Sequence, residues 1–127
     1  MGNDAPKVLL VEDDRLLRKA ADAALRERGY AVVTAADGVA ALQAARAERP
    51  DLILLDLIMP RMHGYEVLRT LKADAQLADV PVLVLTNLGA ESDTQIATQA
   101  GAADYLIKAS LSLEDLMRRV DEALRRR

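Results

Sequence analysis

The chain has 127 residues, about half of them apolar, and a formal net charge of −3. That length suits one domain with a single packed core. The absence of cysteine excludes disulfides, thiolate metal sites and cysteine nucleophiles. The mild acidity gives no general attraction to nucleic acid or anionic membranes. The polar N-terminus lacks a signal-peptide core and no apolar run is long enough for a bilayer, so we expect a cytoplasmic protein without membrane or nucleic-acid partners.

Short apolar segments rich in β-branched residues recur along the chain and are typical of strands. They are Lys7–Val11, Tyr30–Ala35, Asp51–Asp56, Pro81–Thr86 and Asp104–Lys108. Several are nearly continuous apolar runs, as expected for parallel strands that are covered on both faces. The sequence shows no repeat and no linker. We therefore expect residues 1–6 to be a disordered N-terminal segment and residues 7–127 to form one domain.

Segments with helical periodicity alternate with these strands. The first of them ends before Gly29, a residue type that favours a helix end. Its apolar residues lie on one stripe: Leu16, Leu17, Ala20, Ala21, Ala24 and Leu25.

Capping residues and periodicity mark the later helices. Asp37 can cap a second helix, which ends before Pro50. The apolar positions of a third helix are Tyr65, Leu68 and Leu71. Residues 91–100 form a weaker fourth helix, and Ser112 with Asp115 resembles a capping box that opens a fifth.

The order of these elements is a strand followed by a helix, repeated to the end of the chain. This (βα)5 order predicts the α/β class, with a doubly wound five-stranded parallel sheet and helices on both faces. Strand order 2-1-3-4-5, the flavodoxin-like order, is the usual solution. In such sheets the site lies at the carboxyl ends of the strands, where the first and third strands meet.

Polar side chains gather at those strand ends. Glu12 and Asp13 follow the first strand, Asp56 ends the third, Thr86 the fourth and Lys108 the fifth. Clustered carboxylates repel one another unless they hold a cation or a proton, and oxygen ligands without His or Cys suit Mg²⁺. Asp56 is then a candidate nucleophile of the aspartyl-phosphate type, with Lys108 and Thr86 in reach of phosphate oxygens. Each residue alone would be an ordinary strand end or solvated charge, so the hypothesis depends on their convergence.

This pattern resembles the receiver domain of two-component response regulators, from Lys7 to the C-terminus. The matching segments are VLLVEDD, DLILLDLIMPRMHGYE, PVLVLTN and ADYLIK. The most specific of them holds the motif D-x-x-M-P-x-x-x-G, here Asp56, Met59, Pro60 and Gly64. Within it, Met59 and Pro60 shape a turn more often than they touch a ligand.

The resemblance implies a role for each acidic residue. Asp13 and Asp56 would ligate Mg²⁺ directly together with the backbone carbonyl of Ile58, and Glu12 would act through water. Asp14 would cap the first helix. Asp56 would accept the phosphoryl group from a sensor histidine kinase or a histidine phosphotransfer protein. Such a domain catalyses only its own phosphorylation and dephosphorylation and is not otherwise an enzyme.

The resemblance also implies how phosphorylation is relayed. Thr86 would be the switch hydroxyl that moves toward the phosphate, and Lys108 would contact the phosphoryl oxygens. Tyr105 would follow the movement of Thr86, unless it is an ordinary half-buried strand aromatic. The surface around strands 4–5 and helices 4–5 would then bind a downstream protein of unknown identity. We expect a monomer before phosphorylation, because residues 91–100 offer no apolar dimer seam.

Several positions depart from the family pattern. Ala109 follows Lys108 where the family has a cis proline, and a cis bond without proline costs about 3 kcal/mol, so we expect a trans bond and a differently shaped loop. Asn87 follows Thr86 where the family favours a small residue. These departures affect switching and dephosphorylation more than phosphorylation itself. His63, the sole histidine, lacks metal-ligand neighbours and is expected to be exposed to solvent.

Other classes of function compete with the receiver. A phosphorylation-independent interaction module would keep the fold and lose the switch. A phosphatase with an aspartyl nucleophile generally needs a second acid two residues later, where this chain has Ile58. A flavodoxin would need a phosphate-cradling loop of Ser, Thr and Gly after the first strand. In this chain Glu12, Asp13 and Asp14 stand there instead, and they would repel a phosphate unless a cation intervened.

Overall fold

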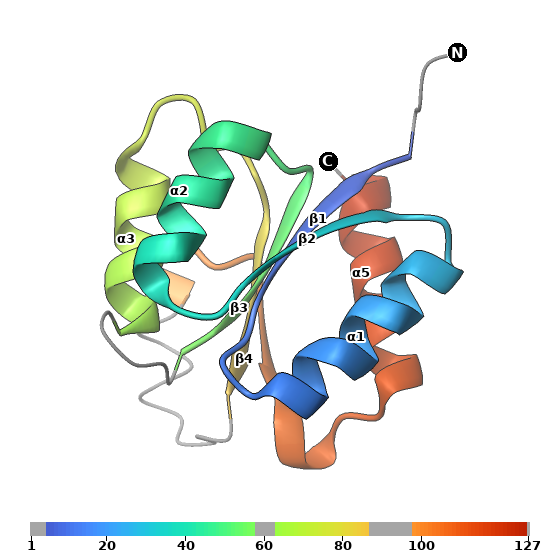
Figure 1. The fold of residues 1–127 in the computed structure, drawn as a ribbon. Helices are drawn as coiled ribbons and strands as arrows, with labels where there is room; N and C mark the ends of the chain where they lie inside the picture. Colours follow the sequence, from blue (N-terminus) through green and yellow to red (C-terminus); the bar gives the residue numbers. More distant parts are fainter. Residues whose placement is uncertain (1–4, 58–62, 87–97, 127) are drawn as a thin grey trace.

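The structure, a computed structural model, describes residues 5–57, 63–86 and 98–126. They form a five-stranded parallel sheet in the order β2-β1-β3-β4-β5, with helices on both faces (Figure 1). The predicted α/β class and flavodoxin-like strand order are confirmed. No helix within these ranges combines the length and the apolar composition that crossing a bilayer requires.

The strands coincide closely with the predicted apolar segments. They are β1 (Lys7–Val11), β2 (Ala31–Ala35), β3 (Leu52–Asp56), β4 (Val82–Thr86) and β5 (Asp104–Ile107). Strand β5 ends one residue earlier than predicted, so Lys108 lies just beyond it. There it begins a short 3₁₀ turn, Lys108–Ser110.

The helices also begin and end near the predicted residues. They are α1 (Arg15–Glu27), α2 (Gly38–Glu48), α3 (Gly64–Ala73) and α5 (Leu113–Arg126). The predicted caps are confirmed, because Asp14 and Asp37 accept backbone N–H groups at the starts of α1 and α2 and the Ser112 hydroxyl accepts the Asp115 N–H at 3.0 Å. Gly29 follows α1 with a φ of +93°, which favours glycine. The predicted helix over residues 91–100 lies mostly outside the described residues.

Alternation along the strands divides the core into two layers, one on each face of the sheet. The layer beneath α2 and α3 contains Leu9, Val11, Ile53, Leu55, Val82 and Val84. The layer beneath α1 and α5 contains Val8, Leu10, Leu52, Leu54, Leu83, Leu85 and Leu106. Figure 1 shows the two helix pairs on opposite sides of the sheet. Aliphatic side chains thus fill a core that has no Phe or Trp.

The predicted apolar stripe on α1 is only partly buried. Ala21 and Leu25 are buried, whereas Leu16 is 80% exposed and Leu17 is 40% exposed. An open groove separates the first turns of α1 from the start of α5 and the residues that precede it. The C-terminal half of the helix therefore packs on the sheet, and its N-terminal half lines that groove.

Candidate functional site

The carboxyl ends of β1 and β3 bring the predicted acidic residues together. These strands pair in parallel, with Val11 opposite Leu55, so the residues that follow them emerge side by side. Carboxylate oxygens of Glu12, Asp13 and Asp56 lie within 4.8 Å of one another. Glu12 and Asp56 are buried and Asp13 is exposed. Three oxygen donors at this spacing, one of them open to solvent, fit a hydrated divalent cation such as Mg²⁺.

Lys108 reaches this cluster from the end of β5. Its Nζ atom lies 2.6 Å from Oε1 of Glu12 and 3.2 Å from Oδ2 of Asp56. All three residues continue the strand alternation of the layer beneath α1 and α5, so their side chains emerge on one face. Burial lowers the pKa of Lys108, but the hydrogen bond to Glu12 and the charge of Asp56 outweigh it and raise the pKa above its ordinary value. The lysine is therefore a fixed cation beside the predicted phosphoacceptor.

The turn between β1 and α1 is fixed by side-chain hydrogen bonds. Oε2 of Glu12 accepts the Asp14 N–H at 3.1 Å, and Asp14 in turn caps α1. The Arg18 guanidinium donates to the backbone carbonyls of Glu12 at 2.8 Å and Asp13 at 3.3 Å. Sequence reasoning missed Arg18. An arginine one turn into the helix that follows an acidic loop was the available signal.

Thr86 and Tyr105 lie on the opposite face of the sheet from Lys108. Thr86 ends β4 and is fully buried. Tyr105 is half-buried in β5, opposite Val84, and packs against the layer beneath α2 and α3. Thr86 follows Val84 by two positions and so shares that face. The two predicted switch residues are thus near neighbours across β4 and β5, as a relay between them requires.

The start of α3 packs directly against the backbone behind Asp56. The N–H of Gly64 donates to the carbonyl of Leu57 at 2.9 Å. A Cβ atom on Gly64 would lie 2.5 Å from the Leu57 Cα atom and 2.8 Å from the Asp56 carbonyl oxygen, distances that no side chain tolerates. The glycine that closes the sequence motif is therefore needed for this close approach.

His63 is exposed, as predicted, and has a role that the sequence did not reveal. It caps α3, because its Nδ1 atom accepts the Tyr65 N–H at 3.2 Å and its ring stacks on the Tyr65 ring. Histidine is not among the preferred capping residues, so pattern alone gave no signal.

Several predictions concern residues that the structure does not describe. The Ile58 carbonyl predicted to bind metal, the turn predicted at Met59 and Pro60, and Asn87 all lie outside the described residues. The described part of the chain has no cis peptide bond, which confirms the trans bond expected between Lys108 and Ala109.

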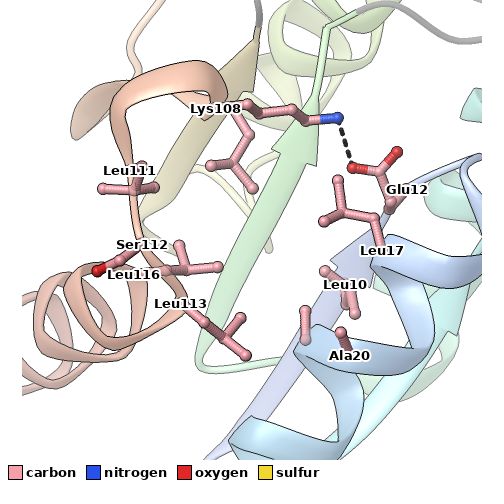
Figure 2. Close-up of a pocket in the computed structure, with 11 residues that line it drawn as sticks. Leu10, Glu12, Leu17, Ala20, Lys108, Leu111, Ser112, Leu113 and Leu116 are labelled. Atoms are coloured by element: carbon pink, nitrogen blue, oxygen red, sulfur yellow. Dashed lines mark ion pairs between the residues drawn. The ribbon is translucent and has the colours of Figure 1, made fainter.

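An apolar groove of about 260 Å³ opens beside the acidic cluster (Figure 2). It runs between α1 on one side and the start of α5, with the residues that precede it, on the other. Its apolar walls include Leu10, Leu17, Ala20, Leu85, Leu111 and Leu113. The ion pair of Glu12 and Lys108 lies at one end of it. Exposed apolar surface is therefore continuous with the predicted phosphorylation site.

A doubly wound sheet with clustered acids, a paired lysine and a buried threonine at its strand ends defines a receiver-type signalling domain. The sequence profile of the response regulator receiver domain matches residues 8–121. The chain belongs to that family, whose members serve two-component signalling.

Individual relatives agree with this assignment. The chain is 42% identical over 120 residues to the response regulator MprA of Mycobacterium leprae, covering 94% of this chain and 51% of MprA. It thus spans about half the length of that relative. The chemotaxis response regulator CheY4 of Vibrio cholerae aligns with a TM-score of 0.88 and 33% identity, over 94% of this chain and 98% of that one. The receiver domain of the sensor histidine kinase PA1611 of Pseudomonas aeruginosa, with a magnesium ion coordinated in its active site cleft, aligns with a TM-score of 0.85 and 33% identity over 94% and 98% of the two chains.

Proposed function

We propose that this chain is a phosphorylation-switched receiver in which Asp56 accepts a phosphoryl group from the phosphohistidine of a sensor histidine kinase or a histidine phosphotransfer protein. The observation that carries the proposal is the setting of Asp56. Its carboxylate is buried, lies 3.2 Å from the Lys108 ammonium and shares the acidic cluster with Glu12 and Asp13. A buried carboxylate is costly unless it is paired, and Asp56 is paired with Lys108. Glu12 and Asp13 beside it provide further oxygen atoms that could bind a metal ion.

The transfer is a displacement at phosphorus. An Oδ atom of Asp56 forms a bond to phosphorus while the phosphorus–nitrogen bond to the donor imidazole breaks, and the electron pair of that bond stays on the imidazole nitrogen. Lys108 is close enough to exchange its contact with Asp56 for a phosphoryl oxygen, because an ammonium group has three donors. Thr86 would donate its hydroxyl to another phosphoryl oxygen.

The donor set of the acidic cluster fits Mg²⁺. Asp13 and Asp56 would hold the ion, with Glu12 acting through water and the Ile58 carbonyl as a further ligand. A bound divalent ion neutralises charge on the phosphoryl group. The magnesium reported for the PA1611 receiver domain supports this choice of cofactor.

Loss of the phosphoacceptor tests the proposal. When the chain is incubated with Mg²⁺ and acetyl phosphate, one phosphoryl group should add about 80 Da to its mass. Asp56→Asn should abolish this mass gain. Asp51→Asn is the matched control, because Asp51 precedes the opposite end of β3 and its carboxylate accepts the Lys7 N–H at 2.8 Å. Labelling should persist in the control. Undiminished labelling of Asp56→Asn would overturn the proposal.

The same proposal covers the output of the switch. Movement of Thr86 and Tyr105 would alter the surface around β4, β5 and α5 and around residues 91–100, where a downstream protein would bind. We further propose a cytoplasmic location, no nucleic-acid partner for this domain and a monomer before phosphorylation. Light scattering with and without beryllofluoride tests the last point, and a dimer without beryllofluoride would contradict it.

A phosphorylation-independent interaction module is the second candidate. The 3₁₀ turn Lys108–Ser110, where the family pattern has proline, favours it because the turn adjoins the lysine that would bind phosphate. An NMR titration with Mg²⁺ and beryllofluoride separates the two functions. Saturable shifts at Thr86 and Tyr105 would support the switch, and a spectrum without shifts would support the module.

A further inference from the structure

We propose that Arg18 is a positioning residue that fixes the turn between β1 and α1 and so holds Glu12 and Asp13 ready for a divalent cation. This inference deepens the proposed function and rests on it for the identity of the ligand. Arg18 itself touches no carboxylate oxygen of the cluster among its described hydrogen bonds. Its contribution would pass through the backbone that carries the two acids.

The contacts of Arg18 span the whole turn. Its side chain donates to the carbonyl oxygens of Glu12 at 2.8 Å and Asp13 at 3.3 Å. Its backbone N–H donates to the carbonyl of Asp14 at 2.9 Å. One residue of α1 therefore contacts three successive carbonyls. A planar guanidinium on a half-buried side chain loses little freedom in making such contacts.

The remaining contacts of the turn show what Arg18 adds. The sheet fixes its beginning, because the Glu12 N–H donates to the Ala35 carbonyl at 3.0 Å. The cap of Asp14 fixes its end on α1. Between these points the peptide carbonyls of Glu12 and Asp13 face Arg18. Without Arg18 these carbonyls would bond to water instead, and the backbone that carries the Asp13 side chain would be less restrained.

Charge and positioning predict opposite effects on metal affinity. A guanidinium close to the acidic cluster repels a divalent cation, so its removal would tighten Mg²⁺ binding if charge alone mattered. If Arg18 instead orders the ligands, its removal weakens binding. Loss of a residue that orients metal ligands typically weakens affinity by about tenfold or more. The direction of the change therefore distinguishes the two roles.

Variants of α1 separate these effects. Arg18→Met removes the charge and the donors and keeps an apolar stem. Arg18→Lys keeps the charge and can supply a donor, without the planar fork, and should recover part of the affinity. Lys19→Met is the matched control, because Lys19 is the next residue of the helix, is exposed and makes no ion pair among the described residues. It loses the same charge with no loss of contact to the turn.

The experiment is an NMR titration of each purified variant with Mg²⁺ alone, together with amide hydrogen exchange at Asp13 and Asp14 without metal. We expect Mg²⁺ to bind about tenfold more weakly to Arg18→Met, less weakly to Arg18→Lys and with unchanged affinity to Lys19→Met. We also expect faster exchange at the two amides in Arg18→Met only. Tighter binding to Arg18→Met, or equal exchange in all variants, would overturn the inference.

Failure of the proposed function would look different. If the unaltered chain shows no saturable shifts with Mg²⁺, the metal site is absent and the proposed function fails. The exchange measurement still decides whether Arg18 orders the turn. Equal exchange rates in the Arg18→Met and unaltered chains would then reject the positioning role as well.

Discussion

Lys108 and Glu12 form an ion pair of 2.6 Å at the strand ends, with only 16% and 3% of their side chains exposed. The lysine therefore neutralises part of the acidic cluster from within the protein. Any divalent cation that binds Glu12 and Asp13 does so in competition with this internal cation. We therefore expect Lys108 to affect both the stability of the metal-free domain and its affinity for a divalent cation.

Substitution of Lys108 by methionine should separate those two effects. Removal of one partner from a largely buried pair leaves uncompensated charge, so we expect Lys108→Met to lose roughly 2 kcal/mol of unfolding free energy without metal. The same variant should bind Mg²⁺ more tightly, because a competing cation is gone. Urea denaturation and a Mg²⁺ titration measure the two quantities.

Lys7→Met provides the comparison for that variant. Lys7 pairs with Glu48 at 3.0 Å, but about a third or more of each side chain is exposed. Such surface pairs contribute at most about 1 kcal/mol, and this one lies at the opposite end of β1. Metal affinity should not change in Lys7→Met. Unaltered affinity in Lys108→Met as well would show that the lysine does not compete with the metal.

Gly64→Ala should disturb the site through the backbone of Asp56 and Leu57, against which Gly64 packs. The new methyl group would overlap the backbone of Asp56 and Leu57, so either α3 or the end of β3 must move. We expect a loss of about 1–3 kcal/mol in unfolding free energy and weaker Mg²⁺ binding. Denaturant titration measures the unfolding free energy, and an NMR titration with Mg²⁺ measures the metal affinity.

The control for Gly64→Ala is Gly29→Ala. A methyl group there meets no atom within 4 Å, but the positive φ of +93° makes it strained. Because of this backbone strain the variant should lose about 1 kcal/mol of unfolding free energy. Its affinity for Mg²⁺ should equal that of the unaltered chain. If both variants bind Mg²⁺ equally well, the packing of Gly64 does not control the position of Asp56.

The two halves of α1 should respond differently to truncation. Leu25 is fully buried against the sheet, so Leu25→Ala should cost about 2–5 kcal/mol of unfolding free energy. Leu16 is 80% exposed, and Leu16→Ala should change stability by less than about 0.5 kcal/mol. Parallel denaturant titrations compare the two. Equal losses would mean that Leu16 is buried in solution.

These variants mark the boundary of what the sequence could predict. Strand order and the convergence of Asp56 and Lys108 followed from chain order, because parallel strands place their carboxyl ends at one edge. Contacts between elements were less accessible. The exposure of Leu16 depends on how α1 packs against the sheet, which the apolar period of a helix does not determine. The contacts of Arg18 and His63 are local, but only the position of the arginine beside an acidic loop indicated the first, and histidine is not a preferred capping residue.

Tyr30 provides a pH-dependent prediction. Burial and its hydrogen bond to the Asp121 carboxylate raise the pKa of Tyr30 from 10.0 to about 12. The folded pKa exceeds the unfolded one, so the stabilising contribution is complete below pH 10 and is lost as the pH rises toward 12. Since the site is partly exposed, Tyr30→Phe should cost only about 1 kcal/mol near neutral pH. Urea denaturation measures the difference in unfolding free energy between the unaltered chain and Tyr30→Phe. This difference should become smaller above about pH 10, because ionisation removes the hydroxyl donor. A difference that stays constant across that range would mean that the Tyr30 hydroxyl does not bond to Asp121 in solution.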